Sequence, residues 1–362
     1  MDVNTGAVLA MSTTPAYDPN QPRVLADKAA REAVEGLSGD ERAAALQLAQ
    51  QTQWRNKAVS DLYEPGSVFK LITCAAALDT GAVSKNSSFY CGESISVAGT
   101  RFHCANHKRH GAQTVTQALE NSCNQSFIQI GARWAKRRSA TTLRPSASAR
   151  HRHRPARRAE KKPLLHRRPD GAGGAGVLRF RAEQQDLLPR DGVGGLRCGQ
   201  RRAADAAYVV SDILGPEGEV IDHLSPVCKR QVLKEETSRT MREMMEAVVL
   251  YGGGRNAQIA GYRVGGKSGT SQKLDSADEK ARIASFVAVA PIDDPQFLCL
   301  VCLDEPHSWT TAGGSLSAPV CAEVLEQTLV YKGVPRAAVP DTPASDAVTS
   351  ADLPEDGDSF DG

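Results

Sequence analysis

Aromatic residues make up only 5% of this 362-residue chain. No apolar run reaches the length of about 18 residues that a membrane-spanning helix needs. A charged start followed by a short apolar core, which is typical of an export signal, is also missing. Taken literally, the sequence therefore predicts neither a membrane span nor an export signal. The formal net charge of +2 is too small to indicate a nucleic-acid partner.

The remaining composition is that of a folded protein. A hydrophobic content of 41% is enough to bury a sizeable core in one large domain or two. The charges are unevenly placed, because about a dozen Lys and Arg fall between Lys136 and Arg168, whereas the end from Asp341 onward is acidic and contains no Lys or Arg.

An S-x-x-K pattern at Ser67 and Lys70 carries the first chemical signal. Pro65 and Gly66 precede a run of good helix formers, so we predict that Ser67 lies in the first turn of a buried helix. Residues three apart share a helix face, which places Lys70 beside Ser67. A desolvated ammonium loses its proton more easily and can then accept one from the hydroxyl, while the helix dipole favours the alkoxide. An ordinary helix start is the alternative, because this pattern also occurs by chance.

Two further motifs strengthen the catalytic interpretation. Residues 122–124 (Ser-Cys-Asn) supply an S-x-N pattern, and residues 267–269 (Lys-Ser-Gly) supply a K-[ST]-G pattern. The three motifs in this order are the signature of penicillin-binding proteins and serine β-lactamases. With the flank at 55–60, the sequence resembles class B penicillin-binding proteins, particularly those of Gram-positive sporulating bacteria. The resemblance covers residues 1 to about 135 and about 207 to 333.

This resemblance implies an α/β fold of the penicillin-binding protein transpeptidase and serine β-lactamase type. It predicts an antiparallel sheet flanked by helices, a helical subdomain, and a transpeptidase domain over residues 1–333. The implied activity is that of a peptidoglycan D,D-transpeptidase, which cross-links stem peptides through an acyl-serine intermediate without metal or cofactor. The implied partners are stem peptides ending in D-Ala-D-Ala, β-lactams and a membrane glycosyltransferase. A β-lactam-binding sensor module and an inactive remnant remain as alternatives.

The family's functional residues fall on eight positions of this sequence. The catalytic set is Ser67, Lys70, Ser122 and Lys267, and the substrate-binding set is Asn124, Ser268, Gly269 and Thr270. By resemblance, Ser122 relays protons between nucleophile and Lys267, Asn124 holds the substrate amide, and Lys267 and Thr270 face the substrate carboxylate. The backbone N–H groups of Ser67 and Thr270 would form the oxyanion hole. Without the other motifs, Ser122 and Asn124 would be interpreted as a helix-capping pair.

The start of the chain is similar to the start of the family's catalytic domain. Class B proteins carry an N-terminal membrane anchor and a non-catalytic domain ahead of it, and Met1–Met11 resembles the first strands after these parts, with Asn4–Gly6 as the turn. We therefore expect Met1 to be an internal start and the anchor to be missing. The location implied by the resemblance is the outer face of the cell membrane.

The polar stretch 87–111 holds two cysteines and three histidines, namely Cys91, His103, Cys104, His107 and His110. Zinc is one interpretation. The spacing fits no standard zinc-ligand pattern and the family is metal-independent, so we favour a Cys91–Cys104 disulfide on the outer face of the cell. We expect the other cysteines to be small core residues, except Cys123 inside the S-x-N motif.

Residues 137 to about 206 depart abruptly from the family. They contain Arg-His-Arg-His-Arg at 150–154, a Gly-rich run at 170–176 and no apolar period. A basic linker is one interpretation. We favour a compensated frameshift, because nucleotides that spell residues 164–171 can, one register over, spell Tyr-Tyr-Thr-Ala-Asp-Arg-Met-Gly, which resembles the family. We expect this segment to be poorly ordered and residues 334–362 to be a disordered acidic tail.

Apolar periodicity predicts the remaining elements. These are a solvated helical insertion at 24–53, helices on both sides of the S-x-N motif at 114–134, a helix at 235–249, a strand at 259–264 that delivers Lys267, a hairpin at 283–302 and a closing helix at 318–329.

Overall fold

The computed structural model describes residues 1–142, 203–205, 207–226, 228–273, 276 and 278–336. The expectations for the segment 137–206 and for the acidic tail fall almost entirely outside these described residues.

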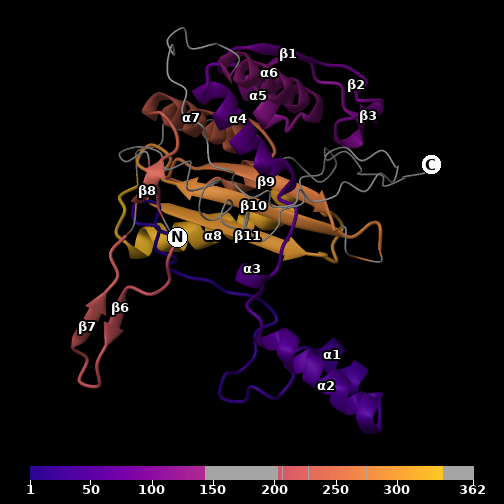
Figure 1. Cartoon of the computed structure of the whole chain (residues 1–362), viewed down its shortest axis with the longest axis vertical. Coiled ribbons are helices and arrows are strands. Elements are labelled where there is room, and N and C mark those ends of the chain that lie inside the picture. The colour runs from indigo at the N-terminus through magenta and orange to yellow at the C-terminus, as the bar shows by residue number, and fades with distance from the viewer. Residues whose placement is uncertain (143–202, 206, 227, 274–275, 277, 337–362) are drawn as a thin grey trace, which may run out of the picture.

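A three-stranded antiparallel sheet forms the centre of the molecule (Figure 1). Its order is β11 (Phe297–Asp304), β10 (Arg282–Ala290), β9 (Gly265–Gln272). The predicted hairpin is confirmed as β10 and β11, and β10 also pairs with the strand that carries Lys267. The middle strand is buried along almost its whole length, which explains its continuous apolar run.

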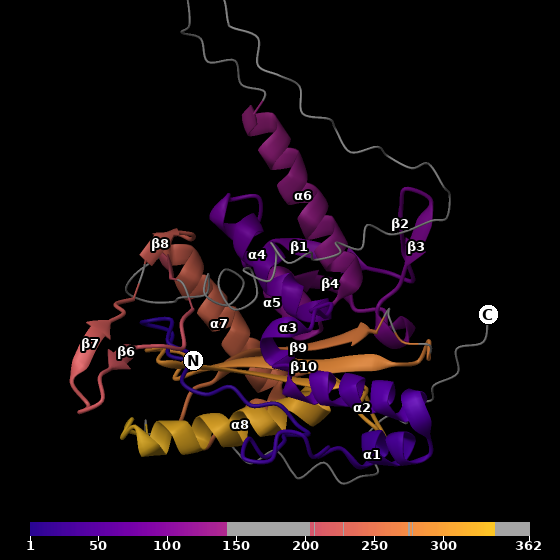
Figure 2. The ribbon, with the colours of Figure 1, turned by 60° about the horizontal axis from the view of Figure 1, so that its bottom comes forward.

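Two helices cover opposite faces of this sheet. Side chains alternate along a strand, so Val287 and Val289 of β10 pack in one core with α7 (Glu235–Tyr251), whereas Phe286 and Ala288 pack in another with α8 (Gly313–Tyr331). On α7 the buried face includes three methionines, which are Met241, Met244 and Met245. Figures 1 and 2 show the two helices on either side of the sheet.

A helical region lies on the α7 side of the sheet. It contains α4 (Phe69–Asp79), α5 (Val115–Glu120) and α6 (Asn124–Thr142), together with the strand pair β1 (Ser88–Cys91) and β4 (Gly111–Thr114). Its buried residues belong to the same core as the methionines of α7. The described part of the chain therefore consists of a sheet layer and a helical layer that meet through one continuous core.

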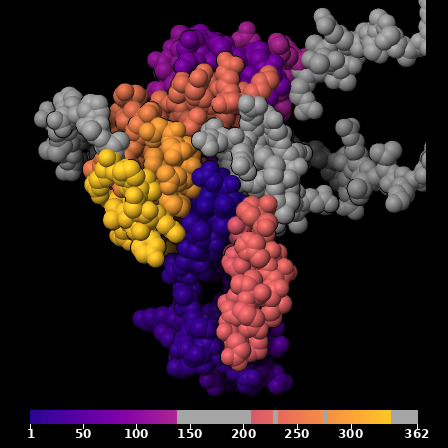
Figure 3. Space-filling view, turned by 90° about the vertical axis from the view of Figure 1, so that its left-hand side faces the viewer, coloured from indigo at the N-terminus to yellow at the C-terminus, as the bar shows by residue number. Residues whose placement is uncertain are grey.

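Smaller elements complete the described chain. They are α1 (Lys28–Glu35), α2 (Gly39–Trp54), α3 (Lys57–Ser60), η1 (Gly66–Val68), β2 (Ile95–Val97), β3 (Thr100–Phe102), η2 (Ala105–His107), β5 (Ala203–Asp205), β6 (Asp212–Leu214), β7 (Val220–His223), β8 (Cys228–Gln231) and η6 (Arg255–Ala257). The α1–α2 pair and the β6–β7 hairpin project from the body (Figures 1 and 3). No residue of α2 is buried, and the rest of the insertion buries only Leu25 and Val34, so this helical insertion is largely a solvated one, as predicted.

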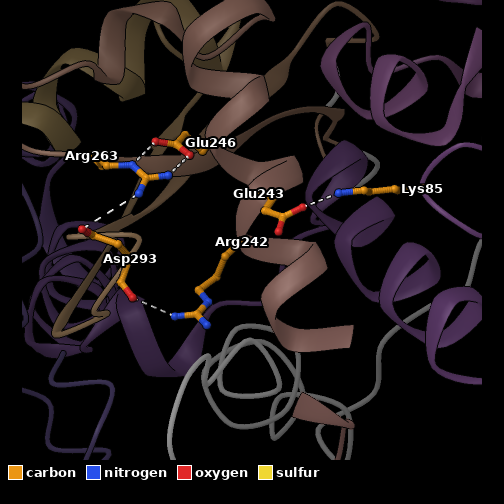
Figure 4. A network of polar contacts seen from close by, with 6 residues as sticks. All are labelled: Lys85, Arg242, Glu243, Glu246, Arg263 and Asp293. Atoms are coloured by element: carbon orange, nitrogen blue, oxygen red, sulfur yellow. Dashed lines mark hydrogen bonds and ion pairs between the residues drawn. The ribbon is translucent and has the colours of Figure 1, made fainter. Parts of the chain in front are cut away.

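Ion pairs connect α7 to Arg263, just before β9, on one side and to Lys85, between α4 and β1, on the other (Figure 4). The Arg263 guanidinium donates two hydrogen bonds to Glu246, at 2.7 and 2.6 Å, and approaches Asp293 at 4.0 Å. On the other side, Lys85 Nζ lies 2.6 Å from a Glu243 carboxylate oxygen. The Lys85–Glu243 pair is exposed and contributes little to stability, so on that side the buried methionine face of α7 is the main attachment.

Two predicted elements are wrong in detail. The strand expected at 259–264 is only an isolated bridge between Ile259 and Tyr262, and the regular strand begins at Gly265. A Cβ on Gly265 would lie 2.5 Å from the Ile292 side chain, so close packing, and not a turn, requires this glycine. The opening hairpin is likewise a turn with isolated bridges, in which Asp2 pairs with Phe297.

Among the described residues, no helix has the length and apolarity needed to cross a membrane.

Candidate active site

The turn before α4 presents Ser67 at the start of a helix, as the sequence predicts. Gly66 has φ of +51°, and a Cβ at this position would lie 2.8 Å from the Thr270 carbonyl oxygen. Only glycine fits both the left-handed backbone and this close approach. The serine turn is therefore pressed against strand β9.

Lys70 lies one helical turn after Ser67 and contacts three polar side chains. Its Nζ donates to Ser67 Oγ at 3.1 Å, to Ser122 Oγ at 3.2 Å and to Asn124 Oδ1 at 2.7 Å. It also donates to the Ser122 carbonyl. Burial lowers the pKa of Lys70 to about 8, since desolvation penalises the charged ammonium. A neutral amine within reach of the Ser67 proton is therefore accessible near neutral pH.

Lys267 reaches the same place from β9. It is 1% exposed, and its Nζ donates to Ser122 Oγ at 3.0 Å, to the Ser268 carbonyl at 3.0 Å and to Ser268 Oγ at 3.4 Å. Burial, with a smaller contribution from the charge of Lys70, holds the pKa of Lys267 well below its usual value. The Ser122 hydroxyl thus lies between the two lysine amines.

The S-x-N motif occupies the short turn between α5 and α6, as expected. Ser122 has φ of +48°, a left-handed conformation that is unfavourable for serine, and its N–H donates to the Leu119 carbonyl. Asn124 begins α6, and its Nδ2 donates to the His103 carbonyl at 3.0 Å. Each polar atom of this amide makes one hydrogen bond, which fixes the Asn124 side chain beside Lys70 and leaves one N–H and one oxygen lone pair for a substrate.

The strand residues after Lys267 close the site on one side. A Cβ on Gly269 would lie 2.8 Å from the Pro65 carbonyl oxygen and 2.5 Å from Ser285 Oγ. The glycine therefore has a packing reason, whereas its predicted purpose, the approach of a substrate backbone, stays a prediction. Thr270 is exposed, and its Oγ1 accepts a hydrogen bond from the Gly313 N–H at 3.3 Å.

The eight predicted site residues therefore lie in one region, where the helical layer meets β9. A continuous chain of polar contacts runs through Ser67, Lys70, Ser122, Lys267 and Ser268. Asn124 branches from Lys70, and the 269–270 stretch packs against the serine turn. Nothing in the sequence predicts that the His103 carbonyl holds Asn124, because a backbone partner has no residue-type signature.

The expected Cys91–Cys104 disulfide is not formed. Both cysteines are free, and their sulfurs are 3.6 Å apart, against about 2.05 Å in a disulfide. Instead they form a cluster with His110 and Cys123, in which the four potential ligand atoms lie within 4.8 Å of one another. We call these four residues the thiol–imidazole cluster.

The other candidates from the polar stretch lie outside this cluster. His103 and His107 contact each other, with ring centroids 4.6 Å apart. The expectation of core cysteines is confirmed for Cys74 and Cys321, which are buried. It is wrong for Cys302, which is exposed.

Residues 1–144 and 207–326 match the family model of the penicillin binding protein transpeptidase domain. The chain belongs to this family. The resemblance to class B penicillin-binding proteins and the expected fold class are thereby confirmed. The family match is interrupted between residues 144 and 207, over most of the segment that departs from the family pattern.

Two named relatives show how similar this penicillin-binding protein domain is to individual members of the family. It is 33% identical over 295 residues to stage V sporulation protein D of Bacillus subtilis, covering 77% of this chain and 44% of that protein. It is 27% identical over 341 residues to peptidoglycan D,D-transpeptidase FtsI of Escherichia coli, covering 90% and 49%. The chain thus spans about half the length of these relatives.

A solved structure agrees on the fold. The D,D-transpeptidase domain of a peptidoglycan glycosyltransferase from Eggerthella lenta matches with a TM-score of 0.63 and 21% identity. The match covers 92% of this chain and 77% of that chain. At this identity the likeness concerns the fold alone.

Proposed function

We propose that this chain is the catalytic domain of a peptidoglycan D,D-transpeptidase that works through an acyl-enzyme on Ser67. The observation that carries the proposal is the continuous contact from the Ser67 hydroxyl through Lys70 and Ser122 to Lys267. It joins a nucleophile, a buried amine and a proton relay in one line. The names of the relatives, which include a D,D-transpeptidase, support the same activity.

Acylation begins with proton transfer from Ser67 Oγ to the neutral Lys70 amine, 3.1 Å away. The alkoxide attacks the carbonyl carbon between the two terminal D-alanines of a stem peptide. The backbone N–H groups of Ser67 and Thr270 serve as the oxyanion hole. The proton then passes to the leaving amine through the Ser122 hydroxyl, and D-alanine departs.

Transfer reverses these roles. An amine of a neighbouring stem peptide attacks the Ser67 ester, and its proton moves through the same relay back to the serine oxygen. A new amide bond forms and the enzyme is restored. Because Ser122 Oγ lies 3.2 Å from one lysine amine and 3.0 Å from the other, it can pass a proton in either direction.

The side chains around this chain of polar contacts bind the substrate. Thr270, exposed at the strand that carries Lys267, binds the terminal carboxylate. The arriving carboxylate favours the charged form of the buried Lys267, which then provides positive charge toward it. Asn124 holds the substrate amide, and Ser268 and Gly269 line the strand. A β-lactam, whose strained amide mimics D-Ala-D-Ala, acylates Ser67 in the same way.

The cellular setting follows from the resemblance. The chain acts at the outer face of the cell membrane, beside a membrane glycosyltransferase that supplies the glycan strands. The names of the relatives point to sporulation or peptidoglycan synthesis as the process.

A β-lactam-binding sensor is the competing function, since it uses acylation without transfer. A stem pentapeptide ending in D-Ala-D-Ala, incubated with an acceptor amine, separates the two. We expect release of D-alanine together with an amide product of the acceptor, measured by mass spectrometry. Covalent penicillin labelling without either product would identify the sensor function instead.

The pH dependence of acylation tests Lys70 as the base. A base acts in its neutral form, and the Lys70 pKa is about 8, so the acylation rate should rise with pH below this value and level off above it. We expect about a tenfold rise per pH unit on the acidic limb. The measurement is the second-order rate constant for a penicillin without groups that titrate in this range. A rate that is flat across pH 8 would contradict this role of Lys70.

A further inference from the structure

At the turn that carries the S-x-N motif, three cysteine sulfurs and one imidazole lie close together in the interior. They come from four places in the chain: Cys91 ends β1, Cys104 follows β3, His110 precedes β4, and Cys123 lies between α5 and α6. Cys91 and Cys123 are fully buried, and Cys104 is 6% exposed. The acyl-transfer steps use none of these four side chains, so the cluster requires another explanation.

Three distances within the thiol–imidazole cluster are close to those between the ligands of one metal ion, and all four ligand atoms lie within 4.8 Å of one another. The Cys104 sulfur is 3.6 Å from that of Cys91 and 3.5 Å from that of Cys123, and His110 Nδ1 is 3.4 Å from the Cys91 sulfur. In tetrahedral zinc coordination, sulfur ligands are separated by about 3.8 Å, and sulfur and nitrogen by about 3.5 Å. All four ligand atoms can therefore reach one ion with small adjustments.

A disulfide explains the cluster less well. Cys104 is near two sulfurs at almost equal distances, so one bond would leave a third buried thiol unpaired. It would also leave unexplained the imidazole nitrogen that faces Cys91. Simple core packing fails for the same reason, because a polar ring nitrogen directed at sulfur adds nothing to apolar burial.

Cys123 has a surrounding suited to a thiolate. The Ser126 N–H donates to its sulfur at 3.4 Å. The protonated Cys123 thiol donates to the Ser126 hydroxyl oxygen at 3.3 Å, and once the thiol loses its proton the hydroxyl can donate to the sulfur instead. Gln113 Nε2 donates to that hydroxyl oxygen at 2.9 Å, which leaves the hydroxyl proton free to point toward the sulfur. Hydrogen bonds of this kind orient and stabilise metal-bound ligands.

We propose that Cys91, Cys104, His110 and Cys123 form a structural zinc site. The protein supplies all four corners of a tetrahedron, which is the arrangement of structural and not catalytic zinc. Three sulfur ligands select zinc over magnesium or calcium, which prefer oxygen. On binding, the three thiols release their protons to solvent, and no electron is transferred.

Zinc at this site would hold the S-x-N turn, residues 122–124, in position. Cys123 lies between Ser122 and Asn124, and Asn124 donates to the carbonyl of His103, the residue before Cys104. The ion would thus fix both partners of the contact that directs Asn124 toward Lys70. This positioning role rests on the proposed function, whereas zinc binding itself does not.

The first test is the metal content of the unaltered full chain. After reduction, loading with Zn²⁺ and removal of excess metal, we expect one zinc per chain by mass spectrometry. Replacement by Co²⁺ should give the intense visible bands of tetrahedral cobalt and a thiolate charge-transfer band in the near ultraviolet. A chain that retains no zinc, or six-coordinate cobalt bands, would overturn the proposal, and neither measurement depends on a variant that folds.

Paired variants locate the ligands. Cys104→Ser and His110→Ala should weaken zinc binding at least about tenfold, because each removes a direct ligand. The matched controls are Cys302→Ser and His107→Ala, whose side chains are exposed and outside the cluster, and which should keep full zinc content. Equal zinc loss in controls and ligand variants would contradict the assignment.

A chelator tests the positioning role. Removal of zinc from the unaltered chain should slow covalent penicillin labelling by about tenfold or more, and zinc added back should restore it. Labelling at full rate without zinc would refute the positioning role. The two proposals fail separately: zinc binding without any labelling refutes the transpeptidase, whereas labelling by a chain that binds no zinc refutes the site.

Discussion

The Lys70→Met variant is expected to react with a labelled penicillin about 10²–10⁴-fold more slowly than the unaltered chain. Methionine fills much of the same space but has no amine, so the proton acceptor 3.1 Å from Ser67 Oγ is lost. The variant also loses the hydrogen bond that Asn124 Oδ1 accepts at 2.7 Å. The measurement is the second-order rate constant of covalent labelling.

Lys85→Met is the matched control for this experiment. Lys85 lies on the surface in an ion pair with Glu243, and loss of an exposed pair has little effect. We expect its labelling rate to stay close to that of the unaltered chain. If the Lys70 variant kept its near-ultraviolet circular dichroism and reacted as fast as this control, Lys70 would not be the base.

A second large effect is expected for Ser67→Ala, which should abolish covalent labelling. The alanine variant has no hydroxyl at the helix start, so no acyl-enzyme can form there. Ser67→Cys keeps a nucleophile and is expected to leave a trace of labelling.

Ser122→Ala provides the informative comparison, because Ser122 Oγ is also within hydrogen-bond distance of Lys70. This variant removes the relay but keeps the nucleophile, so it should label slowly and at the same position. If the Ser67→Ala variant were labelled and the Ser122→Ala variant were not, Ser122 would be the nucleophile and the assignment of Ser67 would be wrong.

Much of the site could be predicted because its signals are local. The spacing of Ser67 and Lys70 fixes them on one helix face, and the S-x-N motif interrupts an apolar period at the turn where the structure has it. The amphipathic pattern at 235–249 likewise predicted the helix that joins the two layers. The family resemblance then brought these distant motifs together.

The features that sequence reasoning missed depend on packing between distant segments. The strand predicted at 259–264 stops before Gly265 and Gly266, whereas both glycines belong to β9 and lie against Ile292 and Phe286. The polar stretch 87–111 contains Cys91, Cys104 and the nearby histidines, but Cys123 lies outside it, in the S-x-N motif. Since Cys123 supplies the third sulfur, the pattern could not be complete within that stretch.

The most direct test of Ser67 as the nucleophile of one assembled site is the position of the acyl group in the unaltered chain. The protein is incubated with penicillin, its intact mass is measured, and the modified residue is located by peptide mass spectrometry. We predict a single adduct per chain, on the peptide that contains Ser67, and none in the Ser67→Ala variant. An adduct on another residue, or full labelling of the alanine variant, would contradict the assignment.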